Sequence, residues 1–222
     1  FLVVVWKHLQ LPNPTPVQLD IAEYMQDGPK RRIIEAFRGV GKSWMAAAYV
    51  LWLLRNDPQK KIMVVSASKM RADDFAQFCL RLIREMDILK CLEPDRDEQR
   101  SASNRFDVRP ATPDQSPSVK SVGIFGQLTG SRADLILADD CEVPNTAWTV
   151  GMREKLIVSV GEFNAILKPG GEIMFLGTPQ TEESIYNKLQ TKGYECRIWP
   201  SRYPKKPQKY GAALAPMILE KC

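Results

Sequence analysis

The stretch from Arg32 to Ser43, R-I-I-E-A-F-R-G-V-G-K-S, constrains the fold of this chain more than any other. An apolar pair, Ile33 and Ile34, precedes a glycine turn that ends in Lys42-Ser43, and the residues that follow favour a helix. A strand, a glycine loop and a helix in this order form a phosphate-binding site, because loop N–H groups and the positive end of the helix surround the phosphate oxygens. The sequence therefore predicts an α/β core that binds a nucleotide.

The loop matches the pattern G-x-x-x-x-G-K-[ST] except at its first position, where Ala36 replaces glycine. In this pattern the lysine reaches the β- and γ-phosphates of ATP, and the serine hydroxyl ligates Mg²⁺. We expect these residues to bind ATP: Arg38, Gly39, Val40, Gly41, Lys42, Ser43 and Trp44. The alternative is a glycine turn before an amphipathic helix, without a ligand.

A second apolar run, starting at Leu135, ends in the carboxylates of Asp139, Asp140 and Glu142. A buried parallel strand beside a phosphate loop delivers carboxylates in this way, and we expect Asp139 to hold the Mg²⁺ of ATP. A neighbouring carboxylate would orient the attacking water, and either Asp140 or Glu142 could do so. We lean towards Glu142 for its longer reach. The alternative is an acidic helix cap.

Two polar segments complete the predicted site. Gln18, in P-T-P-V-Q, could read the adenine edge, because an amide donates and accepts at once; a helix cap at Thr15 is the alternative. Thr178 and Gln180, in T-P-Q-T after a predicted strand at Glu172–Gly177, could sense the γ-phosphate, with a simple turn as the alternative.

The rest of the chain alternates between strand and helix patterns. We predict strands at 61–66, 119–125 and 196–199, helices at 70–90, 152–167 and 185–189, a turn at 167–171 and an irregular segment at 92–117. The basic segment Arg202–Lys209 could contact DNA or could simply be solvated.

Composition narrows the function further. The net charge of +5 is compatible with a polyanionic partner, and the one histidine, His8, excludes a multi-histidine metal site. The five cysteines show no C-x-x-C spacing, and no apolar run has the length of a membrane span. We therefore expect a soluble protein without a membrane partner.

Four motifs together resemble the ATPase domain of large terminase subunits, the DNA-packaging motors of tailed phages, and above all the short-tailed-phage type called DNA maturase B. They are P-T-P-V-Q, A-F-R-G-V-G-K-S-W, G-S-R-A-D-L-I-L-A-D-D-C-E-V-P-N and F-L-G-T-P-Q-T-E-E-S-I-Y, and the likeness runs from about Pro14 to Tyr186. The resemblance implies a RecA-like P-loop NTPase fold of the additional-strand class, with a mostly parallel sheet and helices on both faces. It also implies ATP hydrolysis with Mg²⁺ that moves double-stranded DNA into a procapsid.

The resemblance also implies partners and places: the portal protein, the small terminase subunit, a homo-oligomeric ring on the procapsid and a monomer when isolated. The location would be the host cytoplasm and, transiently, the portal vertex. We expect one ATPase domain over 1–222, with an adenine-motif segment at 1–30 and a basic tail at 200–222 that would lead to a nuclease domain this chain lacks. Because the chain begins at Phe1, we expect it to be a piece of a longer protein.

Two arginines receive catalytic roles from this reading. Arg38 is unusual in a phosphate loop and could point at the γ-phosphate or at the strand-end carboxylates. Arg132 could act across a subunit boundary as an arginine finger, whereas the alternative is that it pairs with Asp134 or caps its loop.

Two rival functions share these motifs. A helicase-like or DNA-remodelling ATPase would use the same loop, Gln18 and Asp139, but 222 residues leave room for one RecA-like unit only. A nucleotide-dependent switch or DNA clamp would leave the carboxylates after Asp139 idle, and steady ATP turnover would exclude it.

Overall fold

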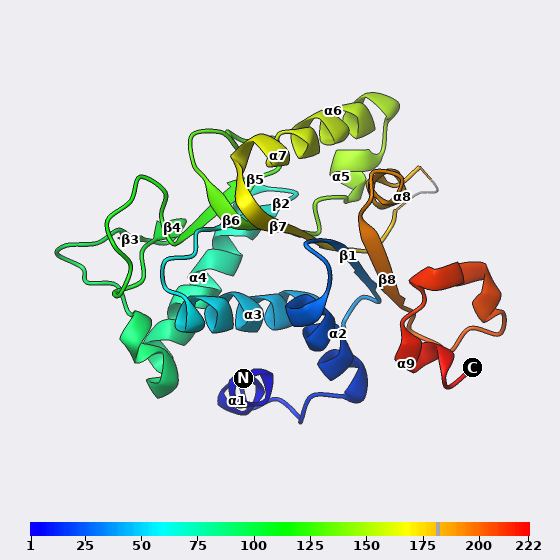
Figure 1. Cartoon of the computed structure of the whole chain (residues 1–222), viewed down its shortest axis with the longest axis horizontal. Coiled ribbons are helices and arrows are strands. Elements are labelled where there is room, and N and C mark those ends of the chain that lie inside the picture. Colours follow the sequence, from blue (N-terminus) through cyan, green and yellow to red (C-terminus); the bar gives the residue numbers. More distant parts are fainter. Residues whose placement is uncertain (181–182) are drawn as a thin grey trace.

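The computed structural model describes residues 1–180 and 183–222 and contains a central sheet with helices on both faces (Figure 1). The strands are β1 Arg31–Ala36, β2 Ile62–Ser66, β3 Ser101–Ala102, β4 Arg105–Phe106, β5 Val119–Gly123, β6 Ala133–Asp139, β7 Leu167–Gly177 and β8 Glu195–Trp199. The α-helices are α1 Leu2–His8, α2 Pro16–Asp27, α3 Lys42–Asn56, α4 Lys69–Glu85, α5 Pro144–Ala147, α6 Val150–Gly161, α7 Phe163–Ile166, α8 Ile185–Gln190 and α9 Pro216–Leu219. The 3-10 helices of the described residues are η1 Asp87–Leu92 and η2 Pro207–Ala213.

The strand order is β3-β4-β5-β2-β6-β7-β1-β8, and every neighbouring pair from β5 to β8 is parallel. β7 lies between β1, which leads into the phosphate loop, and β6, which ends at Asp139. This inserted strand is the feature that defines the additional-strand class, so the predicted fold is confirmed. Parallel strands bring their carboxyl ends to one edge, where open α/β sheets bind ligands.

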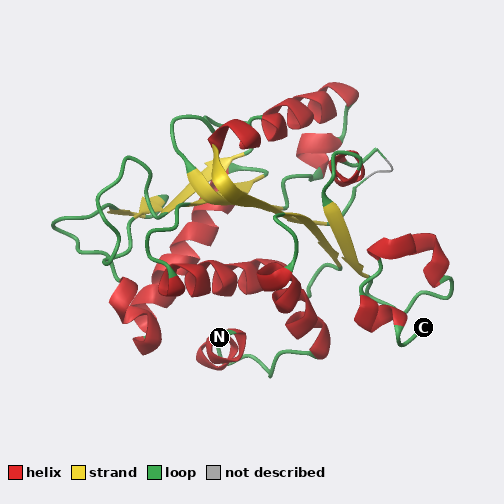
Figure 2. Cartoon of the chain, viewed as in Figure 1, coloured by secondary structure: helices red, strands yellow, loops and turns green. Residues whose placement is uncertain are grey.

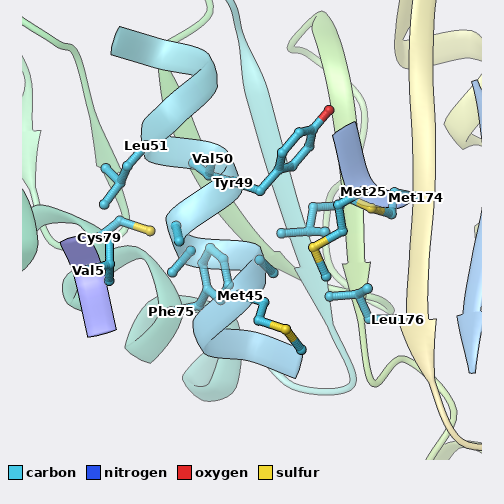
Figure 3. Close-up of a cluster of buried hydrophobic side chains, with 14 of the residues drawn as sticks. Val5, Met25, Met45, Tyr49, Val50, Leu51, Phe75, Cys79, Met174 and Leu176 are labelled. Atoms are coloured by element: carbon cyan, nitrogen blue, oxygen red, sulfur yellow. The ribbon is translucent and has the colours of Figure 1, made fainter. Parts of the chain in front are cut away.

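Helices cover both faces of the sheet (Figure 2). Among the described residues, alternate positions of the parallel strands supply two hydrophobic cores, one on each face. On one face, Ile34 and Met174 pack with the α1–α4 layer, whose α3 contributes Met45 and Leu51 (Figure 3). On the other face, Ile33 and its neighbours on the adjacent parallel strands pack against α6, α7 and α8. The near-continuous apolar runs of these strands therefore reflect burial on both sides.

Several predicted boundaries are wrong. The single helix expected at 152–167 is two helices, α6 and α7, and β7 begins at Leu167 and runs through the expected turn. Leu167 pairs with Ala133 before a register shift, and Gly170 has the left-handed φ of 78° that such an irregularity requires.

Two other segments differ from expectation. The helix expected at 70–90 ends at Glu85, because Met86 adopts an extended backbone, and η1 follows. The segment at 92–117 adds β3 and β4 as antiparallel strands at the sheet edge.

The last residues pack onto the core beside β8. Leu214, Ala215 and Ile218 are buried, and Leu214 forms a parallel bridge with Ile198. The exposed, basic part of the tail at 200–222 therefore ends before Leu214. No helix in the described part of the chain is both long and apolar enough to cross a membrane.

Candidate active site

The phosphate loop connects β1 to α3 and curls around the side chain of Lys42. Gly39 and Gly41 both have a φ of 86°, a conformation in which a side chain would be strained, so glycine is required at these two turns. The Lys42 Nζ donates to the carbonyl oxygens of Ala36 at 2.7 Å and Phe37 at 3.4 Å. Burial lowers the pKa of Lys42, and the charges of nearby Asp140 and Asp139 oppose that shift.

Ser43 and Asp139 join the loop to the end of β6. The Ser43 hydroxyl donates to Asp139 Oδ2 at 2.8 Å, while the buried Oδ1 has no hydrogen-bond partner among the described residues. Burial raises the pKa of Asp139 to about 6, the Ser43 hydrogen bond opposes this, and the neighbouring Asp140 charge adds to it. An unpartnered carboxylate oxygen beside a serine hydroxyl is a donor set that suits Mg²⁺, which prefers oxygen ligands. The residues present therefore fit the predicted metal.

Asp140 lies in a left-handed turn directly after β6, with a φ of 46° that is uncommon outside glycine. Its N–H donates to the Leu176 carbonyl at 2.9 Å, which fixes the turn. Asp140 is half-buried and lines two hollows beside Ser43 and Trp44, with volumes of about 350 Å³ and about 340 Å³. Arg38 and Lys42 also line the second hollow. Asp140 therefore faces the space around the phosphate loop.

Glu142, which we preferred as the water-orienting residue, is directed elsewhere, so the geometry favours Asp140 and either assignment stays a prediction. Its Oε1 accepts from the Gln180 N–H at 2.9 Å, and its Oε2 accepts from the Ser184 hydroxyl at 2.9 Å and the Ile185 N–H at 2.6 Å. The residue is only 2% exposed. Both oxygens are engaged by residues that follow β7, so the longer side chain does not reach back across the loop.

The predicted coupling residues lie against the phosphate loop. The Thr178 hydroxyl donates to the Ala36 carbonyl at 3.3 Å, and the Gln180 amide donates to the Thr178 carbonyl at 2.8 Å. Arg38 donates to Gln180 Oε1 in a long hydrogen bond of 3.4 Å, a contact that neither predicted target of Arg38 included. Thr181, the last letter of T-P-Q-T, lies outside the described residues.

Gln18 forms the helix cap that we gave as its alternative role. Its Oε1 accepts from the Thr15 N–H at 2.8 Å, and the Thr15 hydroxyl accepts from the Gln18 N–H at 3.3 Å, which is a complete capping box. The Gln18 amide also donates to the Val40 carbonyl of the phosphate loop at 2.9 Å. Adenine recognition by Gln18 stays a prediction.

Arg132 stands at the amino end of β6, at the opposite edge of the sheet from Asp139. At about 3.3 Å per residue the strand separates them by roughly 20 Å, so Arg132 does not act on the site of its own chain. Its guanidinium donates to the Ala165 carbonyl at 2.7 Å. The predicted pair with Asp134 is wrong, because that carboxylate contacts Lys168 at 3.1 Å. A role across a subunit boundary stays a prediction.

Two residues near the site escaped the sequence reasoning. Ser184 is fully buried and is the N-cap of α8, which the serine before I-Y-N-K could have signalled. Arg71, in the first turn of α4, lines the hollow beside Ser43, and its charge lowers the pKa of Asp139. No sequence pattern points to Arg71, since its place depends on how α4 packs.

Comparisons with known proteins agree with this geometry. No family model matches the chain. The chain is 50% identical over 227 aligned residues to the large terminase subunit of Enterobacteria phage T3, and the alignment covers 99% of this chain and 39% of that protein. The chain thus spans well under half the length of this relative. The resemblance predicted from the four motifs is confirmed.

Solved structures share the fold. The ATPase domain of a Thermus phage large terminase, in a mutant form, gives a TM-score of 0.51 at 18% identity, over 82% of this chain and 71% of that one. A Saccharomyces cerevisiae dbp5 variant bound to nup159, gle1, IP6 and ADP gives a TM-score of 0.50 at 14% identity, over 86% of this chain and 48% of that one. At these identities the likeness concerns the fold alone.

Proposed function

Because this chain is homologous over nearly its whole length to part of a large terminase subunit, we propose that it hydrolyses ATP to drive double-stranded DNA into a phage procapsid. One observation carries the catalytic part of the proposal. The Ser43 hydroxyl of the phosphate loop contacts Asp139 at 2.8 Å, and the second oxygen of Asp139 is buried and without a partner among the described residues. A phosphate loop joined to an open strand-end carboxylate is the arrangement of Mg²⁺-dependent NTPases.

Each residue of the loop has a defined task in this proposal. Gly39, Val40 and Gly41 present backbone N–H groups to the phosphates, and Lys42 leaves the Ala36 and Phe37 carbonyls to reach the β- and γ-phosphates. Trp44, half exposed beside Ser43, covers the nucleotide. Gln18 reads the adenine edge once its amide leaves the Thr15 N–H and the Val40 carbonyl. Ser43 and Asp139 would hold Mg²⁺, which supplies positive charge to the transferring phosphoryl group.

Asp140 is the carboxylate that orients the attacking water in our proposal. It faces the hollow that Lys42 and Arg38 also line, whereas both oxygens of Glu142 are already engaged. A general base must lie within hydrogen-bond reach of the proton it takes, and position therefore outweighs the length of the side chain here.

The partners rest on the family resemblance and not on the site. We propose that the chain works with DNA, the portal of the procapsid and the small terminase subunit, as a homo-oligomeric ring in the host cytoplasm. The rival, a helicase-like remodeller, shares the fold seen here. Fifty per cent identity to a terminase subunit favours the packaging role.

The test is Mg²⁺-dependent ATP turnover by the chain, alone and with DNA and portal-bearing procapsids. Lys42→Ala should abolish turnover, because the transferring phosphoryl group loses its positive partner. Lys30→Ala removes a lysine from the other end of β1, where it is exposed, and should leave turnover unchanged. Full activity of Lys42→Ala would refute the site, and turnover that procapsids and DNA never raise would argue against the packaging role.

A further inference from the structure

Glu142 is a buried carboxylate, and within the described part of the chain its side-chain oxygens accept hydrogen bonds from one short stretch. The donors are the Gln180 N–H, the Ser184 hydroxyl and the Ile185 N–H, at 2.9, 2.9 and 2.6 Å. We call residues 178–180 and 183–185 the coupling segment. Hydrogen bonds to an ionised acceptor are stronger than neutral ones, so Glu142 holds this segment firmly to the turn after β6.

The same segment touches the phosphate loop at its other side. The Thr178 hydroxyl donates to the Ala36 carbonyl at 3.3 Å, and Arg38 donates to the Gln180 side chain at 3.4 Å. Gln180 is thus held by Glu142 through its backbone and by Arg38 through its side chain. The bond to Arg38 is long and exposed, whereas the three bonds to Glu142 are between 2.6 and 2.9 Å, two of them buried and the one from Gln180 partly buried. One side of the segment is therefore fixed, and the other can respond to the loop.

We propose that Glu142 is a positioning residue that keeps Gln180 in register with Arg38, so that the nucleotide state of the phosphate loop reaches the coupling segment. This inference rests on the proposed ATPase function. Glu142 does not touch the reacting atoms, and its effect on turnover passes through Gln180. The end of β6 and the turn after it then have two tasks. Asp139 and Asp140 take part in hydrolysis, and Glu142 transmits the nucleotide state to the coupling segment.

The decisive variants are Glu142→Gln, Gln180→Ala and the double variant. Glutamine offers one acceptor oxygen and an NH₂ group where the carboxylate accepted three hydrogen bonds, so at least one donor of the segment loses its partner. We expect each single variant to lower kcat about tenfold with KM within about threefold. The double variant should be no slower than the slower single variant, since both changes interrupt one route.

The matched control is Glu183→Gln. It makes the same chemical change in the same segment, but Glu183 is exposed and pairs with Arg153 at 2.7 Å. Its turnover should equal that of the wild type. Multiplicative losses in the double variant, or unchanged kcat in Glu142→Gln, would overturn the positioning role.

Amide hydrogen exchange provides a readout that needs no turnover and also guards against a folding defect. In Glu142→Gln the amides of Gln180 and Ile185 should exchange faster, while those of the buried strand β7 keep their protection. Unchanged exchange at both amides would contradict the inference, and loss of protection throughout β7 would replace it with a role in folding. A wild-type chain that neither binds nor hydrolyses ATP would instead refute the proposed function, so the two failures are distinguishable.

Discussion

Asp139 is the last residue of β6 and Glu142 follows it by three residues, yet their carboxylates have opposite surroundings. Asp139 is bonded through one oxygen to Ser43, and its other oxygen is buried without a partner among the described residues. Glu142 accepts three hydrogen bonds and has both oxygens engaged. The first carboxylate is open towards the phosphate loop, and the second is closed by the coupling segment.

This difference shows that burial alone does not reveal the role of a carboxylate. A buried charge without partners costs free energy, and a fold retains it where a ligand supplies what is missing. A buried carboxylate whose two oxygens both accept hydrogen bonds already has partners and acts by holding other groups in place. Open carboxylates at this edge should therefore affect chemistry when they are changed, and closed ones should affect position.

The largest effect should come from Asp139→Asn. Asparagine keeps an acceptor for Ser43 but loses the negative charge that would hold Mg²⁺, so turnover should fall by about 10³-fold or more. Turnover as a function of Mg²⁺ concentration measures this. Asp134→Asn, at the amino end of β6, is the matched change and should retain turnover. An unchanged rate and an unchanged metal dependence in Asp139→Asn would show that Asp139 does not hold the catalytic Mg²⁺.

Arg132 tests whether the opposite edge of the sheet contributes to a neighbour's site. An arginine finger is worth about 10³-fold or more in rate, and Arg132 is exposed where its own site is out of reach. Mixing Lys42→Ala chains with Arg132→Ala chains on procapsids should restore hydrolysis, since one supplies the finger and the other the site. Assembled mixed rings that stay inactive would assign Arg132 to its contact with Ala165 alone.

Arg38→Ala should give an intermediate effect, because Arg38 joins the open and closed sides. We expect kcat to fall about tenfold and ATP affinity to change by less than about threefold. Steady-state kinetics and nucleotide titration separate the two quantities, with Arg96→Ala, an exposed arginine far along the chain, as the control. If affinity alone changes, Arg38 is a ground-state contact with ATP.

The smallest effect should come from a change at Glu35, and it is a gain in stability where the other variants lose turnover. The Oε1 atom of Glu35 is buried without a hydrogen-bond partner in the described chain. Burial raises the pKa of Glu35; the hydrogen bond with Cys196 opposes this rise, and the charge of Glu142 adds to it. A raised pKa stabilises the folded chain below the ordinary pKa, and this contribution is lost as pH rises through the folded value. Glu35→Gln should therefore gain about 1 kcal/mol of stability near neutral pH and little near about pH 4. Denaturant unfolding at the two pH values measures this, and a loss of stability at neutral pH would contradict the prediction.

The sequence predicted the parts of this molecule that depend on local pattern. The phosphate loop, the strand that ends at Asp139 and the placing of Thr178 and Gln180 beside the loop follow from motif order and from the shared edge of parallel strands. The Thr15 cap was predictable as the alternative for Gln18.

What the sequence did not predict depends on contacts between distant segments. Glu142 was preferred as the water-orienting residue because its side chain is longer, whereas its direction is set by contacts with Gln180, Ser184 and Ile185. The start of β7 at Leu167 depends on pairing with Ala133, which no period in the local sequence reports. The target of Arg38 was missed for the same reason.

The most direct test of the open and closed carboxylates compares Asp140→Asn with Glu142→Gln by ATP binding and single-turnover hydrolysis. Asp140→Asn should bind MgATP within about threefold of the wild type and lose hydrolysis by about 10²-fold or more, because the water loses its orienting group. Glu142→Gln should bind ATP equally well and lose only about tenfold. Abolished hydrolysis in Glu142→Gln together with a substantial rate in Asp140→Asn would show that Glu142, and not Asp140, orients the attacking water.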